Sequence, residues 1–354
     1  MDTPPIAPAP ASLVAAGGTH RPKKAADQAD AARPRSLRSA PSVSDSIFAS
    51  TAFVAGLITV AVMLAVGVFL SLRAGDALGV AGLSFLTEQQ WSPETQTFGI
   101  AAVLFGTFAI ALVAMVVSLP LSFGTALLIS EITRGRLQQW LITIVDLMAA
   151  VPSVVFGLWG LFFLQANIVP VAQWIAHSFA WIPIFAVTDE SGAPLTEASA
   201  FTSSAFIAGI VVALMIVPTQ TSVMRETFSQ APIGEREAAL GLGATRWMMI
   251  ANVVLPFGRG GIIGGSMLSL GRALGETIAV YMIISPIFTI NWQVLKTGGN
   301  SVSALIALRY GEASDFSLSA LMAAGLTLFL ITLVINFTAS SIVARSRSGA
   351  QSEA

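Results

Sequence analysis

The sequence contains no cysteine among its 354 residues, which excludes disulfide bonds and thiolate ligands for a metal. It has two histidines, His20 and His177. They supply neither a metal cluster nor a Ser-His-Asp set, so we expect no catalytic residues and no metal site in this chain. Charge is scarce as well, because charged residues make up 10% of the chain, against about 25% in an ordinary soluble domain.

A long soluble protein needs polar and charged groups over its surface, and this chain cannot supply enough of them. Apolar residues make up 55% of it, and its mean hydropathy is +0.78. These values indicate an integral membrane protein surrounded by lipid. Only helices and closed barrels satisfy the backbone in lipid, and the lengths of the apolar runs indicate helices. The expected fold class is therefore an all-α polytopic membrane protein.

Residues 1–45 differ from the rest, since they are rich in Ala, Pro and Ser and carry six basic residues. Such a segment buries too little apolar area to offset the entropy lost on ordering, so we expect a disordered basic tail. The first apolar run begins too late for a cleaved signal peptide, and we expect it to remain as a transmembrane helix. Residues 46–345 would form the transmembrane domain, and 346–354 a second tail.

Six apolar runs are long enough to cross a bilayer, which takes about 20 residues. They cover residues 47–72, 98–130, 140–164, 201–224, 260–284 and 318–343. Pro120 is expected to bend the second run. The third contains Pro152 and, close to its start, Asp146, for which we favour a capping or packing role at the interface.

The distribution of Lys and Arg predicts the orientation, because positively charged loops face the cytoplasm. The two tails and the segments 131–139 and 225–259 carry fourteen of these residues, whereas the loops on the other side carry three. We therefore expect both termini in the cytoplasm. The long outer loop, 165–200, has Trp174 and Trp181 seven residues apart, which predicts one face of a helix lying on the outer surface, with His177 on its solvated side.

The cytoplasmic segment 225–258 predicts a short helix held between two turns. Pro232 suits a helix start, and Gly241 and Gly243 are expected to end the helix and turn the chain. Thr245 can cap a second helix that ends before Pro256. A short helix held in this way is suited to dock in a groove on another protein.

This segment resembles the EAA loop of ABC importer permeases. The residues that match the pattern are Glu237, Ala238, Ala239, Gly243, Leu255 and Pro256, with Val253 where Ile is usual. The resemblance implies that the helix couples the chain to a cytoplasmic ATPase. The chain has no phosphate-binding loop of its own, because none of its three lysines follows a glycine. ATP and Mg would be bound by the partner ATPase, and no cofactor is expected in this chain.

The fifth run contains two charged residues, Arg272 and Glu276, which are four positions apart and can pair on one helix face. Charges are costly inside a membrane, so such groups face a bundle interior or a water-filled path. The pair could clamp the helix to a neighbour, or Arg272 could meet an anion in transit, since a guanidinium fork matches an oxoanion. Small residues at 261 and 265, and at 271 and 275, have the spacing of close helix packing.

Three stretches, "LGRALGETIAV", "AAVPSVVFGLWGL" and "LFLITLVIN", resemble the phosphate-specific ABC permeases, and the PstC subunit more than PstA. The resemblance covers residues 46–345 and implies the type I ABC importer (MetI-like) core in a bacterial cytoplasmic membrane. It implies phosphate as cargo, Arg272 and Glu276 on its path, and Ser153 as a weaker candidate. It also implies four further subunits: a PstA-like permease, two PstB-like ATPases and a PstS-like phosphate-binding protein outside the cell.

Two other transport functions stay open at this stage. The chain could be a permease of the same fold for sulfate, molybdate or tungstate. It could also be an ion-driven secondary transporter that uses Glu276 and Asp146 as proton carriers and needs no ATPase. Membrane lipid is an expected partner, and nucleic acid is not.

Overall fold

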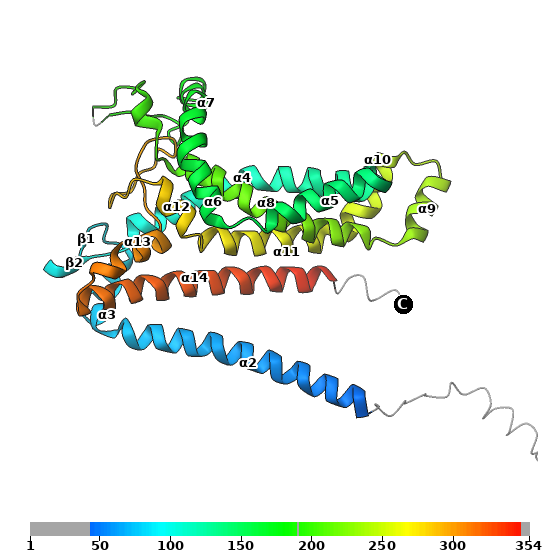
Figure 1. The fold of residues 1–354 in the computed structure, drawn as a ribbon, viewed down its shortest axis with the longest axis horizontal. Coiled ribbons are helices and arrows are strands. Elements are labelled where there is room, and N and C mark those ends of the chain that lie inside the picture. Colours follow the sequence, from blue (N-terminus) through cyan, green and yellow to red (C-terminus); the bar gives the residue numbers. More distant parts are fainter. Residues whose placement is uncertain (1–42, 190, 348–354) are drawn as a thin grey trace, which may run out of the picture. The chain divides into compact units, whose positions relative to one another are not determined.

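The computed structural model describes residues 43–189 and 191–347, and these are predominantly helical (Figure 1). The chain divides into two units, 1–61 and 62–354. The described part of the first unit is the start of helix α2, Val43–Arg73. The predicted tails, 1–45 and 346–354, lie almost wholly outside the described residues.

Six helical segments in the described residues are long and apolar enough to cross a membrane. They are Ser44–Arg73, Ala101–Ile132, Ser153–Ser178, Ala205–Ser229, Arg246–Leu274 and Asp315–Ser341. The predicted first, second, fourth and sixth spans agree with four of them to within five residues at each end. The helical, polytopic fold class is confirmed, and Pro120 lies inside α4 (Ala101–Leu127) as expected.

The predicted third span, 140–164, is interrupted. Helix α5 (Gly135–Ala149) ends before Pro152, and α6 (Ser153–Trp159) begins after it. Proline has no N–H to donate and disfavours the helical conformation of the residue before it, which explains the break. A π-helical turn, η4 (Gly160–Leu164), leads on into α7 (Gln165–Ser178). The third long apolar segment is therefore 153–178.

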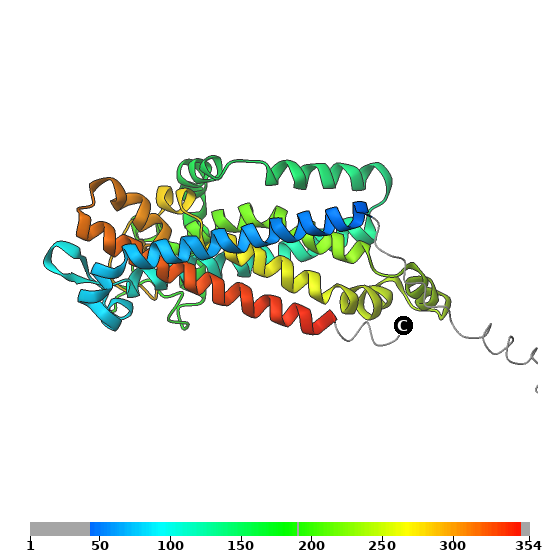
Figure 2. The same cartoon turned by 90° about the horizontal axis from the view of Figure 1, so that it is seen from below.

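Helix α7 matches the predicted outer-surface helix only in part. It runs across the direction of α4 and of α8 (Ala205–Ser229), as Figures 1 and 2 show. It ends at Ser178, so Trp174 lies on the helix and Trp181 beyond it. The two tryptophans do not share a helix face, although both are exposed, by 61% and 78%. His177 is exposed, as expected.

The predicted fifth span, 260–284, begins too late. Helix α10 (Arg246–Met249), the π-helical turn η6 (Ile250–Val254) and α11 (Leu255–Leu274) follow one another without interruption. Pro256 therefore does not follow the end of a helix. It lies in the first turn of α11, after the wider π turn, where proline's missing N–H is tolerated.

The predicted fifth span is also not one continuous helix as far as residue 284. Helix α11 stops at Leu274, and the chain breaks over residues 275–277 before the short helix α12 (Ile278–Ile283). Gly275 stands at the break, and glycine is a poor helix former. Burial of α12 in the main apolar core then outweighs helix continuity.

Helices α4, α8 and α11 lie side by side at the centre of the second unit (Figures 1 and 2). The main apolar core consists mostly of residues from these helices and α12. Close approach requires glycine: a β-carbon on Gly209 would overlap Val113, and one on Gly261 would overlap Thr227.

The predicted small-residue packing is thus confirmed for one pair of glycines. Gly261 and Gly265 of α11 both face side chains of α8. The second pair does not form such a contact. Gly275 lies beyond the helix and has only its own nearby backbone around it, while Gly271 faces Asn336 of α14 (Asp315–Arg347) at ordinary contact distance.

Buried polar side chains join the three central helices. Ser122 Oγ on α4 donates a hydrogen bond to Gln220 Oε1 on α8 at 3.1 Å, and Gln220 Nε2 donates to Ser266 Oγ on α11 at 3.2 Å. All three side chains are buried. Such bonds between membrane helices average about 0.6 kcal/mol, so they fix the mutual position of the helices more than they raise stability.

One end of the second unit is built from short elements. They are α3 (Gly75–Ala81), β1 (Trp91–Ser92), β2 (Thr97–Phe98), α13 (Val302–Arg309) and the 3₁₀ turns η1 (Gly82–Leu86), η2 (Pro93–Thr95), η5 (Ala198–Phe201) and η7 (Tyr310–Glu312). The two strands are antiparallel, with Trp91 opposite Phe98. A second apolar core joins the strands and α13 to α14.

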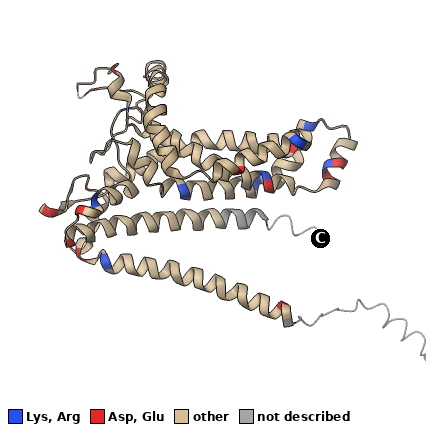
Figure 3. Ribbon diagram, in the orientation of Figure 1, with Lys and Arg blue, Asp and Glu red and all other residues tan. Residues whose placement is uncertain are grey.

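The opposite end carries the helix α9 (Ile233–Gly241) and α10. Charged residues of the second unit gather at these two ends and are sparse along the helices between them (Figure 3). This distribution is the one expected of a bundle whose middle lies in lipid.

Candidate coupling segment and substrate path

Helix α9 forms where the sequence predicts a short cytoplasmic helix. It begins directly after Pro232 and has Glu235 in its first turn, where a carboxylate complements the positive end of the helix dipole. The chain turns at Gly243, whose φ of +87° favours glycine. Thr245 then caps α10, because its hydroxyl oxygen accepts a hydrogen bond from the N–H of Met248 at 3.2 Å.

The matched EAA residues divide between two faces of α9. Glu237 and Ala238 are exposed, whereas Ala239 is half-buried and packs against an apolar cluster. Large apolar side chains flank the exposed face: Ile233 is 72% exposed and Leu242 is 90% exposed. A polar helix face bordered by exposed apolar side chains is typical of a surface that binds another protein.

The last two matched residues lie at the start of α11. Leu255 is half-buried and packs against the same apolar cluster as Ala239. Pro256 is exposed in the first helical turn. The motif thus covers α9, the Gly243 turn and the beginning of a long apolar helix, α11.

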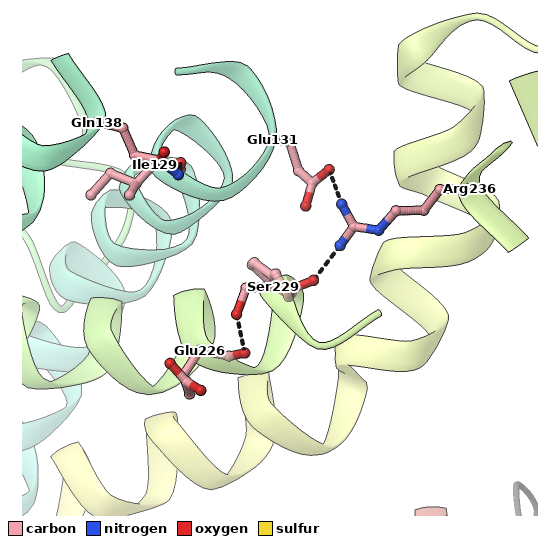
Figure 4. Close-up of polar contacts among 7 residues, drawn as sticks. Ile129, Glu131, Gln138, Glu226, Ser229 and Arg236 are labelled. Atoms are coloured by element: carbon pink, nitrogen blue, oxygen red, sulfur yellow. Dashed lines mark hydrogen bonds and ion pairs between the residues drawn. The ribbon is translucent and has the colours of Figure 1, made fainter. Parts of the chain in front are cut away.

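A buried ion pair fixes α9 to the π-helical turn η3 (Leu128–Ile132), which continues α4. Arg236 Nη1 donates to Glu131 Oε2 at 2.9 Å, and Arg236 Nη2 donates to the carbonyl oxygen of Phe228 at the end of α8. Figure 4 shows the guanidinium between the two acceptors. The Glu131 side chain is 2% exposed, so removal of Arg236 would leave a buried carboxylate without its partner.

Arg272 and Glu276 do not form the ion pair that their spacing predicts. The prediction assumed a continuous helix, and α11 ends at Leu274. Arg272 is exposed, and its Nη1 lies 3.4 Å from Thr219 Oγ1 on α8, to which it donates a long hydrogen bond. Glu276 is half-buried and accepts from the N–H of Ala279 at 3.3 Å. The clamp function would thus involve Thr219 and not Glu276.

Ser153 is the first residue of α6 and is half-buried. Helix α6 packs on α12, where Gly157 leaves no room for a β-carbon against Ala279. The structure therefore brings the helix that carries Ser153 next to the one that follows Glu276. No hydrogen bond or ion pair joins Ser153, Arg272 and Glu276 among the described residues. Asp146 is exposed on α5.

Sequence reasoning missed three polar residues that organise these regions: Glu131, Thr219 and Gln220. Glu131 had a visible signal, because it is a single carboxylate at the end of an apolar run. Thr219 and Gln220 had little signal in the sequence, because uncharged polar residues occur at many positions of membrane helices. Only the residues that contact them in space distinguish these two.

Residues 118–348 match the family described as "Binding-protein-dependent transport system inner membrane component". The chain belongs to this family. The match includes α8 to α12, and therefore both the coupling segment and the break that contains Glu276. The six apolar helices agree with the multi-pass membrane protein that this family description implies.

Similar proteins support the permease's place within the family. The "Phosphate transport system permease protein PstC" of Pasteurella multocida is 38% identical over 265 residues, which cover 73% of this permease and 79% of that protein. PstC 2 of Mycobacterium tuberculosis is 35% identical over 309 residues, covering 86% and 93%. PstC of Mesorhizobium japonicum is 35% identical over 318 residues, covering 87% and 93%. The predicted resemblance to PstC permeases is confirmed.

Solved structures support the fold. A chain of the bacterial alginate ABC transporter, solved with an alginate-bound periplasmic protein, superposes with a TM-score of 0.55 at 15% identity, covering 86% of the permease and 97% of that chain. A second alginate importer structure gives a TM-score of 0.50 at 16% identity, covering 74% and 82%. The expected type I importer fold is confirmed.

Proposed function

We propose that this chain is the membrane-spanning permease subunit of an ATP-driven importer of inorganic phosphate. The observation that carries the proposal is its 34–38% identity to proteins named as phosphate permeases, over 73–87% of its length. The coupling segment and the exposed Arg272 are the parts of the molecule that give this function a mechanism.

The energy for transport would come from a partner. The chain has no phosphate-binding loop, so ATP and Mg would be held by two PstB-like ATPase subunits. Helix α9 presents an exposed face to these subunits. The Arg236–Glu131 ion pair holds the helix in place. ATPase closure would move α9, and the Gly243 turn would pass that movement to α10 and α11.

Phosphate would pass close to Arg272. Within residues 43–189 and 191–347 the guanidinium makes one long hydrogen bond, to Thr219, which leaves its other donors for the oxygens of an oxoanion. This chain would form one half of the translocation path, and a second, PstA-like permease would form the other half. A PstS-like binding protein would deliver phosphate at the end that carries β1, β2 and α13, with α9 and both termini in the cytoplasm of a bacterial cell.

Uptake by the reconstituted complex tests the anion function of Arg272. We expect Arg272→Gln to lower phosphate uptake roughly tenfold or more, since a charged hydrogen-bond donor to the anion is lost. Arg259→Gln is the matched control, because Arg259 is an exposed arginine on the same helix, and it should transport normally. Equal uptake by the two variants would contradict a function of Arg272 in anion passage.

The same preparation separates the remaining transport functions. Excess sulfate or molybdate should leave phosphate uptake unchanged, and strong competition by either would point to another oxoanion as cargo. Uptake should stop without ATP and continue when the proton gradient is collapsed. The opposite result would indicate an ion-driven transporter.

A further inference from the structure

A cavity of about 290 Å³ lies where η3 and the start of α5 meet α9 and α10. Its polar lining includes Ser130, Glu131, Arg134, Gln138, Arg236 and Arg246. Three arginines face one glutamate, so the lining carries more positive than negative charge at neutral pH. The three arginines come from three separate segments, and among the described residues Glu131 pairs with one of them. The remaining cations repel one another unless a further anion lies among them.

Four groups of donors around this cavity have no partners among the described residues: Arg236 Nε, Ser130 Oγ and the guanidinium groups of Arg134 and Arg246. Arg236 Nε and Ser130 Oγ are buried and make no hydrogen bond. Arg134 and Arg246 are exposed, and neither guanidinium takes part in an ion pair or hydrogen bond with a described residue. Buried donors without acceptors are rare in folded proteins, and guanidinium groups match the oxygens of a phosphate group.

One acceptor in the cavity also lacks a partner, and it restricts the identity of the anion. Glu131 Oε2 is bound by Arg236, while Glu131 Oε1 is buried and makes no hydrogen bond. Figure 4 shows this second oxygen directed away from the guanidinium. A carboxylate oxygen can only accept, so the ligand must carry a donor. Inorganic phosphate keeps a P–OH group near neutral pH, whereas sulfate and the phosphodiester of a lipid headgroup have none.

We propose that this cavity is a second phosphate site, separate from the transport path and adjacent to the coupling helix. The phosphate oxygens would accept from Arg134, Arg246 and Arg236 Nε, and the P–OH would donate to Glu131 Oε1. A bound phosphate would link α10 and the start of α5 to the existing Arg236–Glu131 pair. The choice of phosphate among oxoanions rests on the proposed function, but the presence of an anion site does not.

Radiolabelled phosphate binding to the purified complex, without ATP or binding protein, tests the site. The double variant Arg134→Gln/Arg246→Gln removes two exposed cations, and we expect it to weaken binding at this site about tenfold or more. Arg259→Gln, an exposed arginine outside the cavity, should bind like the natural protein. Arg272→Gln should lower uptake and still retain the phosphate binding that the double variant loses, so failure of the cavity site and failure of the proposed transport path are distinguishable.

Selectivity is the second readout. Phosphate should compete for the site much better than sulfate. Glu131→Gln should reduce that preference, because the amide oxygen would stay on Arg236 and the NH2 group would replace the acceptor for P–OH with a donor. Nanodiscs made with anionic or zwitterionic lipid should show the same phosphate binding. Equal binding by the double variant and Arg259→Gln would overturn the proposal. Displacement of phosphate by anionic lipid would overturn the assignment to inorganic phosphate in favour of a headgroup.

Discussion

Gly261 and Gly264 lie on the same helix, α11, and differ in what a β-carbon would meet. At Gly261 it would overlap Thr227 of α8, whereas at Gly264 it would meet open space. We expect Gly261→Ala to destabilise the permease by about 1–3 kcal/mol through overpacking. Gly264→Ala should be neutral or stabilise by up to about 1 kcal/mol through helix propensity. Thermal unfolding of the two purified variants provides the comparison, and equal midpoints would show that α8 and α11 are not in close contact at Gly261.

Glu88 gives a prediction on pH at the same scale. Hydrogen bonds from the backbone N–H groups of Gln90 and Gln89 hold the pKa of this carboxyl below its ordinary value of 4.5. A depressed folded-state pKa stabilises the turn above pH 4.5 and loses that contribution as the pH falls through the lowered value. We expect slower amide hydrogen exchange around residues 89–99 in the natural protein than in Glu88→Gln at neutral pH. The difference in exchange should vanish in acid. Equal exchange rates at neutral pH would show that the Glu88 carboxylate does not stabilise this turn.

At the scale of elements, the turn between α9 and α10 determines how α9 is held. Gly243 has a φ of +87°, in the left-handed region that favours glycine. Gly241 does not have a positive φ, and a β-carbon added there would meet open space. An alanine at 243 would cost roughly 1–2 kcal/mol in this conformation and would reorient α9. We expect Gly243→Ala to lower phosphate uptake relative to ATP hydrolysis and Gly241→Ala to leave the ratio unchanged. The ratio is measured in proteoliposomes, and unchanged coupling in both variants would show that the turn is not part of the transmission.

Elements were predictable where a local signal dominates. Apolar run length gave four of the six long helices, Pro232 and Gly241 gave the two ends of α9, and Thr245 gave the start of α10. The break at 275–277 was not predictable, because α12 is separated from α11 by packing in the core and not by a proline. The pairing of Arg272 with Glu276 failed for that reason, and the Arg236–Glu131 pair was missed because its members are 105 residues apart.

The second unit, residues 62–354, has two chemically different ends joined by helices with few charges. One end has α9, α10 and the arginine-lined cavity; the other has β1, β2 and α13. If α9 meets an ATPase and the other end meets a binding protein, the two ends must lie on opposite sides of the membrane. The proposed orientation can therefore be tested by measuring which end is accessible from each side of the membrane.

The absence of cysteine permits the measurement, because any thiol introduced will be unique. Glu237→Cys places a thiol on exposed α9, and Thr95→Cys places one beside the hairpin at the opposite end. In intact cells a membrane-impermeant maleimide should label Thr95→Cys and not Glu237→Cys. In inverted vesicles Glu237→Cys should react, and more strongly after the ATPase has been stripped, because docking on α9 would cover it. Labelling of Glu237→Cys in intact cells would reverse the orientation, and identical labelling with and without the ATPase would remove α9 from the coupling interface.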